Sequence, residues 1–163
     1  MKGGKSSQWT TTPRGSLPYL IDPHEIVSFV EDAIANPAEN RRLVLAETSE
    51  ACALDVQRVA ELDVRGFQFV LDQSDARHVL RSHGDEAYEA QRGLRAITAI
   101  DFGDLPLVLA APDSIELAGM TKTELKVLRF EKLLEGRRSV ALSVRVGRKH
   151  LAILSMWETK QKH

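Results

Sequence analysis

The residues best suited to chemistry lie in one short segment, residues 75–84, which contains two histidines and two arginines. Histidine is the side chain whose ordinary pKa lies nearest to neutral pH, so it is the usual proton carrier in acid–base catalysis. Arginine presents a planar fork of N–H groups that matches the oxygens of a phosphate. The combination of His78 and His83 with Arg77 and Arg81 therefore suggests acid–base chemistry on a phosphodiester.

The spacing of the two histidines argues against a metal site. Five residues of a helix turn through about 500°, so His78 and His83 do not share one narrow stripe. A metal-binding pair on a helix needs a separation of three or four residues. The single cysteine, Cys52, excludes an internal disulfide and a thiolate-rich zinc site, and we expect it to be a buried structural thiol. We therefore predict neither a metal nor another cofactor.

Both histidines also have structural explanations, which the sequence leaves open. His83 stands next to Gly84 at the expected end of a helix, where the helix dipole favours a protonated imidazole, so it could serve only as a C-terminal cap. His78 precedes Val79 and Leu80 and could be a partly buried histidine with satisfied hydrogen bonds. Because the cap explains His83 well, we rank His78 first as the catalytic candidate.

Charge is distributed unevenly along the chain. The formal net charge is −1, but residues 126–163 contain ten Lys or Arg and three acidic residues, which leaves this segment at +7 and residues 1–125 at −8. A basic segment of this kind can form a phosphate-binding surface. It is equally typical of a sheet with a basic, solvent-exposed face, so charge alone does not decide between the two.

Three residues near the C-terminus could contribute to a phosphate site. Alternation along a strand would place Ser155 and Trp157 on one face. The same alternation adds Leu151 and Ile153 to that face. A hydroxyl beside an aromatic ring can bind a phosphate and stack a base, although ordinary packing at a strand end explains the same residues. Arg145 lies between two valines on the preceding strand and could point into a polar cleft.

The first two thirds of the chain predict helices separated by short strands. Residues 85–91 are expected to form a loop. The expected elements are a helix from Asp22-Pro23 to residue 36, a strand at 41–47, a helix capped by Thr48 or Ser49, a strand at 67–71, a helix capped by Ser74 or Asp75 that ends at Gly84, and a short helix that begins with Thr98 and Asp101.

The C-terminal third differs in kind. Segments 125–134, 139–148 and 151–157 are short, partly alternating and separated by glycine-containing turns, which is typical of an antiparallel meander. Helices followed by strands predict an α+β fold. Residues 1–18, rich in Gly, Ser, Thr and Pro, are expected to form a flexible arm, residues 19–46 a helix-and-strand extension, and residues 47–163 the main domain.

Composition excludes several classes of protein. Hydrophobic residues make up 43% of the chain and charged residues 28%, which is ordinary for a soluble globular protein. No apolar run reaches the roughly 18–20 residues needed to cross a membrane, and the polar N-terminus lacks the apolar region of a secretory signal. We expect a cytoplasmic protein with no membrane partner.

The order of these motifs resembles the phage-encoded branch of the barnase–EndoU–colicin–RelE-like (BECR) nuclease superfamily, found as C-terminal domains of phage Mu F-like head proteins and in phage polyvalent proteins. The similarity runs from about residue 47 to residue 160, and six segments occur in the same order. They are Leu62-Asp-Val-Arg-Gly-Phe67, Arg77-His78-Val-Leu-Arg-Ser-His83-Gly84, Ile97-Thr-Ala-Ile-Asp-Phe102, Leu105-Pro106, Pro112-Asp113-Ser-Ile115, and Gly147-Arg-Lys149 with Ser155-Met-Trp157-Glu-Thr-Lys160.

The resemblance implies a fold and an activity. The fold is a set of N-terminal helices packed on a four-stranded antiparallel C-terminal sheet, with the BECR-like nuclease domain at residues 47–163. The activity is that of a metal-independent RNase, often a toxin. The family's helix histidines fall on His78 and His83, and its basic strand position falls on Arg145. Its final Thr-x-Tyr pattern falls on Ser155 and Trp157, where serine keeps the hydroxyl but tryptophan lacks the phenolic oxygen.

The leading hypothesis is therefore an endoribonuclease that uses the 2′-hydroxyl of its RNA substrate as the nucleophile. His78 and His83 would act as acid and base, Arg145 would hold the charge that develops on the phosphate, and Ser155 would donate a hydrogen bond to it. The residues expected to contact the substrate around this centre are Arg77, Arg81, Lys126, Arg129 and Trp157, the last by stacking a base.

Two other hypotheses remain open from the sequence. One is a catalytically inactive nuclease-fold module that binds RNA or a protein, suggested by Trp157 and the near-neutral charge. The other is a structural or assembly protein of a phage particle. If the chain is a toxin, an acidic immunity protein or inhibitor would complement its basic segment, and the toxin would act in the cytoplasm after phage delivery or non-classical secretion.

Overall fold

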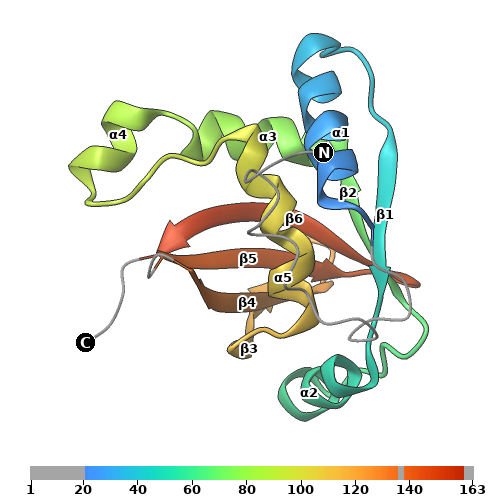
Figure 1. The fold of residues 1–163 in the computed structure, drawn as a ribbon. Coiled ribbons are helices and arrows are strands. Elements are labelled where there is room, and N and C mark those ends of the chain that lie inside the picture. The colour runs from blue at the N-terminus through green and yellow to red at the C-terminus, as the bar shows by residue number, and fades with distance from the viewer. Residues whose placement is uncertain (1–20, 136–137, 160–163) are drawn as a thin grey trace.

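The computed structural model describes residues 21–135 and 138–159. The expected N-terminal arm, residues 1–18, lies outside the described residues. The described residues form five α-helices, a 3-10 helix and six strands (Figure 1). The helices are α1 (Pro23–Ala35), α2 (Glu50–Ala60), α3 (Gln73–His83), α4 (Glu86–Gln91), η2 (Ala99–Asp104) and α5 (Leu105–Ala110). The strands are β1 (Arg42–Glu47), β2 (Gln68–Asp72), β3 (Ser114–Met120), β4 (Lys126–Leu134), β5 (Arg138–Val146) and β6 (His150–Thr159).

The six strands form a single sheet in the order β1-β2-β6-β5-β4-β3. The predicted α+β class is confirmed, but the prediction of a four-stranded antiparallel sheet is wrong in two respects. The sheet has six strands, and β2 pairs with β6 in parallel while every other neighbouring pair is antiparallel. The helix and the strand expected within residues 19–46 are α1 and β1, and β1 forms one edge of this same sheet.

Local capping explains where most helices begin. Asp22 accepts a hydrogen bond from the backbone N–H of His24 at 2.9 Å, and Pro23 occupies the first turn of α1, where a missing N–H is harmless. Ser49 accepts from the N–H of Cys52 at 3.1 Å and caps α2. A reciprocal capping box joins Thr98 to the third residue of η2. These three helix starts confirm the sequence prediction.

Three elements differ from the prediction. The third helix begins at Gln73, one or two residues earlier than the expected caps Ser74 and Asp75, because β2 passes into it directly through Asp72. Residues 86–91, expected to be a loop, form α4, whose N-cap Asp85 accepts from the N–H of Tyr88 at 3.0 Å. Strand β3 was not predicted because only Ile115 of its residues is buried, so it lacks the alternation that marks a half-buried strand.

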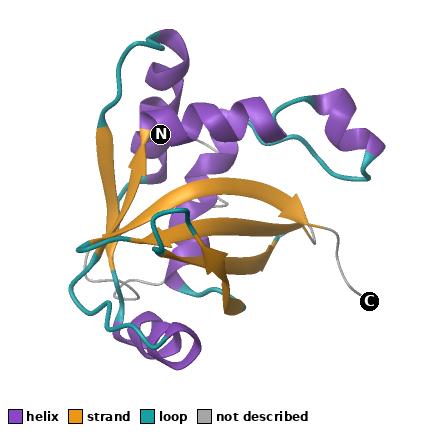
Figure 2. Cartoon of the chain, turned by 180° about the vertical axis from the view of Figure 1, so that it is seen from behind, coloured by secondary structure: helices purple, strands orange, loops and turns teal. Residues whose placement is uncertain are grey.

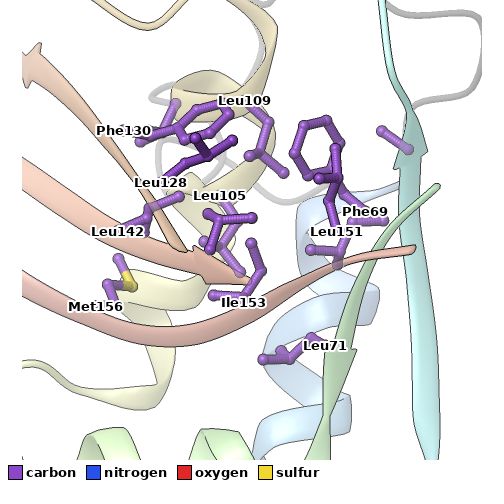
Figure 3. Close-up of a cluster of buried hydrophobic side chains, with 14 of the residues drawn as sticks. Phe69, Leu71, Leu105, Leu109, Leu128, Phe130, Leu142, Leu151, Ile153 and Met156 are labelled. Atoms are coloured by element: carbon purple, nitrogen blue, oxygen red, sulfur yellow. The ribbon is translucent and has the colours of Figure 1, made fainter. Parts of the chain in front are cut away.

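The core fills the space between the sheet and the helices. Helix α5 packs on β4 and crosses in front of the strands in Figure 1, and α1 packs on α3 and η2. Figure 3 shows side chains of the sheet and of α5 meeting there, among them Leu105 and Leu109 of α5 and Met156 of β6. Phe69 and Phe130 meet edge to face with ring centroids 5.8 Å apart, a favourable geometry for aromatic rings.

The helix α3 leaves β2 and runs against β6. The two strands pair in parallel over only three residue pairs, from Gln68 with His150 to Val70 with Ala152. Beyond that point α3 takes the place beside β6 that a longer β2 would have taken. Within the described residues, no helix is both long enough and apolar enough to span a membrane.

Cys52 provides a test of the core. Its side chain is buried, as predicted, and burial together with the nearby Asp55 carboxylate raises the pKa of the thiol to about 12. Because the thiolate is the reactive form, we expect Ellman's reagent at pH 8 to modify the folded protein at least about 100-fold more slowly than the chain unfolded in guanidinium. Equal rates in the two states would contradict this packing.

Candidate functional site

A β-bulge in β6 determines which side chains reach the site. Ser143 of β5 pairs with Ser155 of β6, whereas the next residue, Val144, pairs with Ile153. Leu154 is therefore an extra residue in β6 with no partner in β5. An extra residue of this kind resets the alternation of side chains along its strand.

The bulge overturns one sequence prediction. Ile153 and Met156 both belong to the hydrophobic core, so the residues that alternate with Met156 lie on the other face of the sheet. Ser155 and Trp157 are therefore on the face opposite to Leu151 and Ile153, not on the same face as strict alternation would require. The bulge thus places the hydroxyl and the indole on the side of the sheet opposite to the core residues of β6.

We call the face of β4, β5 and β6 that turns away from α5 the open face. It carries a row of three directly paired residues, Arg129, Ser143 and Ser155, one on each strand. Arg145 and Trp157, each two residues farther along its strand, share this face by alternation. Figure 2 shows the sheet from this side, with the strands in front of α5. The structure therefore brings the predicted Arg129, Arg145, Ser155 and Trp157 to one surface.

Trp157 is in contact with two of the predicted residues. The His83 ring stacks on the indole with ring centroids 5.9 Å apart and an angle of 27° between planes. The guanidinium carbon of Arg129 lies 5.6 Å from the indole centroid, within the range of a cation–π interaction. A surface cavity of about 480 Å³ adjoins this group and is lined by Arg92, Leu94, Arg129, Trp157, Glu158 and Thr159.

His83 is held more firmly than its position at a helix end would require. Its side chain is 19% exposed, and its Nδ1 lies 3.7 Å from Oε1 of the fully buried Glu89. Its backbone carbonyl accepts a hydrogen bond from the N–H of Ile97 at 2.7 Å. His78, by contrast, is exposed, and its Nε2 lies 3.5 Å from Oγ of Ser82. The two histidines therefore occupy different environments on α3.

A second cluster of charged residues surrounds Asp75, which lies in the first turn of α3. Burial raises the pKa of the Asp75 carboxyl above its ordinary value of 3.8, the Asp72 carboxylate adds to this effect, and the positive charges of Arg145, His78 and Arg42 oppose it. Asp72 is itself bound by Arg42 through two hydrogen bonds of 2.7 and 3.0 Å. Asp75 therefore places a carboxyl between His78 of the helix and Arg145 of the sheet.

Arg145 has donor capacity that the fold does not use. Its Nε is buried and has no hydrogen-bond partner within the part of the chain that the structure describes. A buried donor without a partner costs free energy, and such atoms in native proteins often mark a functional site. A phosphate oxygen would supply the missing acceptor.

Of the remaining predicted residues, Arg77 and Lys126 bind backbone carbonyls of neighbouring helices and loops, and Arg81 is exposed to solvent. Arg77 donates to the backbone carbonyls of Ala33 and Glu39, at 2.9 and 2.6 Å, and so ties α3 to the end of α1. Lys126 donates to the carbonyl of Ala60 at 2.5 Å and so ties β4 to the end of α2. The structure gives both a role in holding helices in place. Arg81 is exposed on α3.

Sequence reasoning missed two residues of the site. Asp75 was noticed only as a helix cap, because its nearness to Arg145 depends on how α3 lies on the sheet. Glu89 was assigned to a loop, and no local signal indicates that its carboxylate is buried. Among the described residues, no group of three or more His, Cys, Asp or Glu side chains could hold a metal ion.

The raised pKa of Asp75 predicts a stability effect with a definite sign. The folded protein holds the Asp75 proton more tightly than the unfolded chain does, so the stability that this proton confers is lost as pH rises from 3.8 through the native pKa. At pH 7 the carboxylate therefore costs stability. We expect Asp75→Asn to raise the free energy of unfolding at pH 7, by less than about 1 kcal/mol because the group is only partly buried.

Urea unfolding of both proteins at pH 7 and pH 3 measures this effect. The difference should vanish at pH 3, where both states of the wild type hold the proton. A variant less stable than the wild type at pH 7 would show that the pairing with Arg145 outweighs burial.

One protein family matches most of the chain. The model of one family, described as phage barnase–EndoU–colicin E5/D–RelE-like nuclease 3, matches residues 49–163. A search of curated proteins and a search of solved structures gave no match. The matched segment begins at the N-cap of α2 and includes α3 and all the strands of the open face. The chain therefore belongs to the phage barnase–EndoU–colicin E5/D–RelE-like nuclease 3 family.

Proposed function

We propose that this nuclease-family protein is a metal-independent endoribonuclease whose active site is the open face at β5, β6 and the C-terminal half of α3. One observation carries the proposal: a firmly held histidine, His83, stacks on Trp157 beside Arg129. On the same face of the sheet Arg145 has a buried N–H without a partner. An oriented imidazole and an unsatisfied guanidinium donor on one face of the sheet suit acid–base chemistry at a phosphodiester.

The reaction needs three groups from the protein. A base takes the proton of the 2′-hydroxyl, and the resulting oxygen attacks the adjacent phosphorus. The bond from phosphorus to the 5′-oxygen breaks, and an acid gives that oxygen a proton. The products are a 2′,3′-cyclic phosphate and a 5′-hydroxyl. Guanidinium groups stabilise the negative charge that grows on the phosphate oxygens between these two proton transfers.

The chain offers a residue for each step. His83 and His78 act as the base and the acid, and the tighter environment of His83 makes it the stronger candidate of the two. Arg145 binds the charged phosphate oxygens, and Ser155, at the β6 end of the row that begins with Arg129, donates a hydrogen bond to the phosphate. Arg129 contacts the neighbouring backbone of the RNA.

One observation favours a second function, that of an RNA-binding module that does not cut. The position where the resemblance places tyrosine is Trp157, whose indole lacks a phenolic oxygen and is already in contact with His83 and Arg129. A site without an essential hydroxyl would retain affinity for RNA and lose cleavage. This second function and the nuclease differ in one measurable product, the 2′,3′-cyclic end.

Cleavage of labelled RNA in the presence of EDTA tests the first function. We expect the wild type to form 2′,3′-cyclic ends with EDTA present, and His83→Asn to slow cleavage by about 10²–10⁴-fold because proton transfer is lost. Arg145→Gln should also slow cleavage, by about 10²–10³-fold. Arg58→Gln, an exposed arginine on α2, serves as the control for charge and should leave the rate unchanged. Cleavage at the wild-type rate in His83→Asn would rule out this assignment.

RNA affinity tests the open face without relying on catalysis. In a His83→Asn background, Arg129→Gln should weaken binding and reduce the slope of log affinity against log salt by about 0.7–1, the loss of one phosphate contact. Arg58→Gln should do neither. Binding that falls steeply with salt but yields no cleavage products from the wild type would select the non-cutting module. Equal effects of the two arginines would place the RNA on another surface.

A further inference from the structure

Glu89 is a fully buried carboxylate, which is unusual in a folded protein. It lies on α4, a helix of six residues, yet its side chain is 0% exposed. Burying a carboxylate is costly unless cations and hydrogen bonds compensate for the lost water. Arg92, half exposed, approaches Oε2 at 3.3 Å. The other oxygen, Oε1, has no hydrogen-bond partner within the described residues.

The group nearest to that free oxygen is the imidazole of His83. Oε1 of Glu89 and Nδ1 of His83 are 3.7 Å apart, and Nδ1 is itself buried with no partner in the described part of the chain. Two unsatisfied atoms of complementary chemistry therefore face each other. A small rotation of either side chain would bring them within hydrogen-bond distance, and contacts of this kind commonly tighten when substrate binds.

The rest of the His83 environment restricts that imidazole to one orientation. The ring lies against Trp157 on one face, and the backbone carbonyl of His83 is held by the N–H of Ile97. With Nδ1 turned to Glu89, Nε2 is the nitrogen left for a substrate. A carboxylate that accepts from one ring nitrogen fixes the tautomer and makes the other nitrogen a better base.

We propose that Glu89 is a positioning residue that holds the Nδ1–H tautomer of His83 and stabilises the protonated imidazole. Its catalytic consequence rests on the function proposed above, but the interaction itself does not. The other charged groups near His83 each have a different partner. The nearby cation Arg92 pairs with Glu89, and Arg129 lies over the indole of Trp157. Glu158 on β6 is engaged by Arg95 at 3.3 Å. Glu89 is therefore the carboxylate in contact with the ring.

Fluorescence of Trp157 tests the interaction without any assay of activity. The chain has two tryptophans, so replacing Trp9 with Phe leaves Trp157 as the only one, and a protonated imidazole stacked on an indole quenches it more strongly than a neutral one. In this background we expect a quenching step as pH falls, and no such step in His83→Asn. Glu89→Gln, which keeps the shape and removes the charge, should move the midpoint roughly half to one pH unit lower.

Glu86→Gln is the matched control, because Glu86 lies on the same helix and is exposed. It removes the same charge and should leave the midpoint where the wild type has it. Thermal unfolding of each variant shows that the fold is intact at the temperature of the titration. Equal midpoints in folded Glu89→Gln and Glu86→Gln would overturn the proposal.

The cleavage assay then separates this proposal from the function on which its catalytic part rests. In an active enzyme, Glu89→Gln should move the limb of the pH–rate profile that depends on His83 in the same direction as the fluorescence midpoint. If no RNA is cleaved but the fluorescence midpoint moves, the Glu89–His83 interaction stands and the nuclease assignment fails. If RNA is cleaved with a pH profile that Glu89→Gln leaves unchanged, the positioning role fails and the nuclease assignment stands.

Discussion

The arrangement of the whole molecule depends on the parallel pairing of β2 with β6. The pairing covers three residue pairs, and β2 then passes into α3 with no intervening loop. Because the helix starts where the strand ends, its direction is set by the strand, and α3 must run against β6. That path brings the last residue of α3, His83, to Trp157 near the end of β6. A different partner for β2 would separate the two halves of the site.

The bulge at Leu154 is the second constraint. Before the bulge, Leu151 and Ile153 face the core, and after it Met156 does so. One extra residue therefore keeps the core side of β6 apolar while it sends Ser155 and Trp157 to the open face. Bulges occur often beside active sites, where they redirect a side chain without breaking a strand. Here the bulge places the hydroxyl of Ser155 opposite Ser143 in the row that leads to Arg129.

Local features of the sequence were predictable, and long-range ones were not. The caps at Asp22, Ser49 and Thr98 act over three residues or fewer, so their hydrogen bonds can be inferred from neighbouring residue types. The parallel pairing of β2 and β6 joins residues about 80 positions apart, and no periodicity encodes such a partner. Strand β3 was missed because most of it is exposed, which leaves a strand without its usual pattern.

The site shows the same division between local and long-range information. Residue types in one segment were enough to nominate His78 and His83, but the difference between them comes from residues that approach through the fold. His83 meets Trp157 of the last strand and Glu89 of a helix expected to be a loop. The C-terminal cap that seemed to explain His83 describes its backbone position alone, whereas its ring contacts the sheet and α4.

Trp157 changes what the open face can do in the proposed mechanism. A tyrosine there would offer a phenolic oxygen as a donor or acid, whereas the indole offers a broad face. That face stacks on His83 and supports the Arg129 guanidinium, so the residue fixes the position of two groups instead of acting on the phosphate itself. Proton transfer then depends on the histidines, and the buried carboxylate of Glu89 beside His83 becomes the natural means of keeping one imidazole in the correct tautomer.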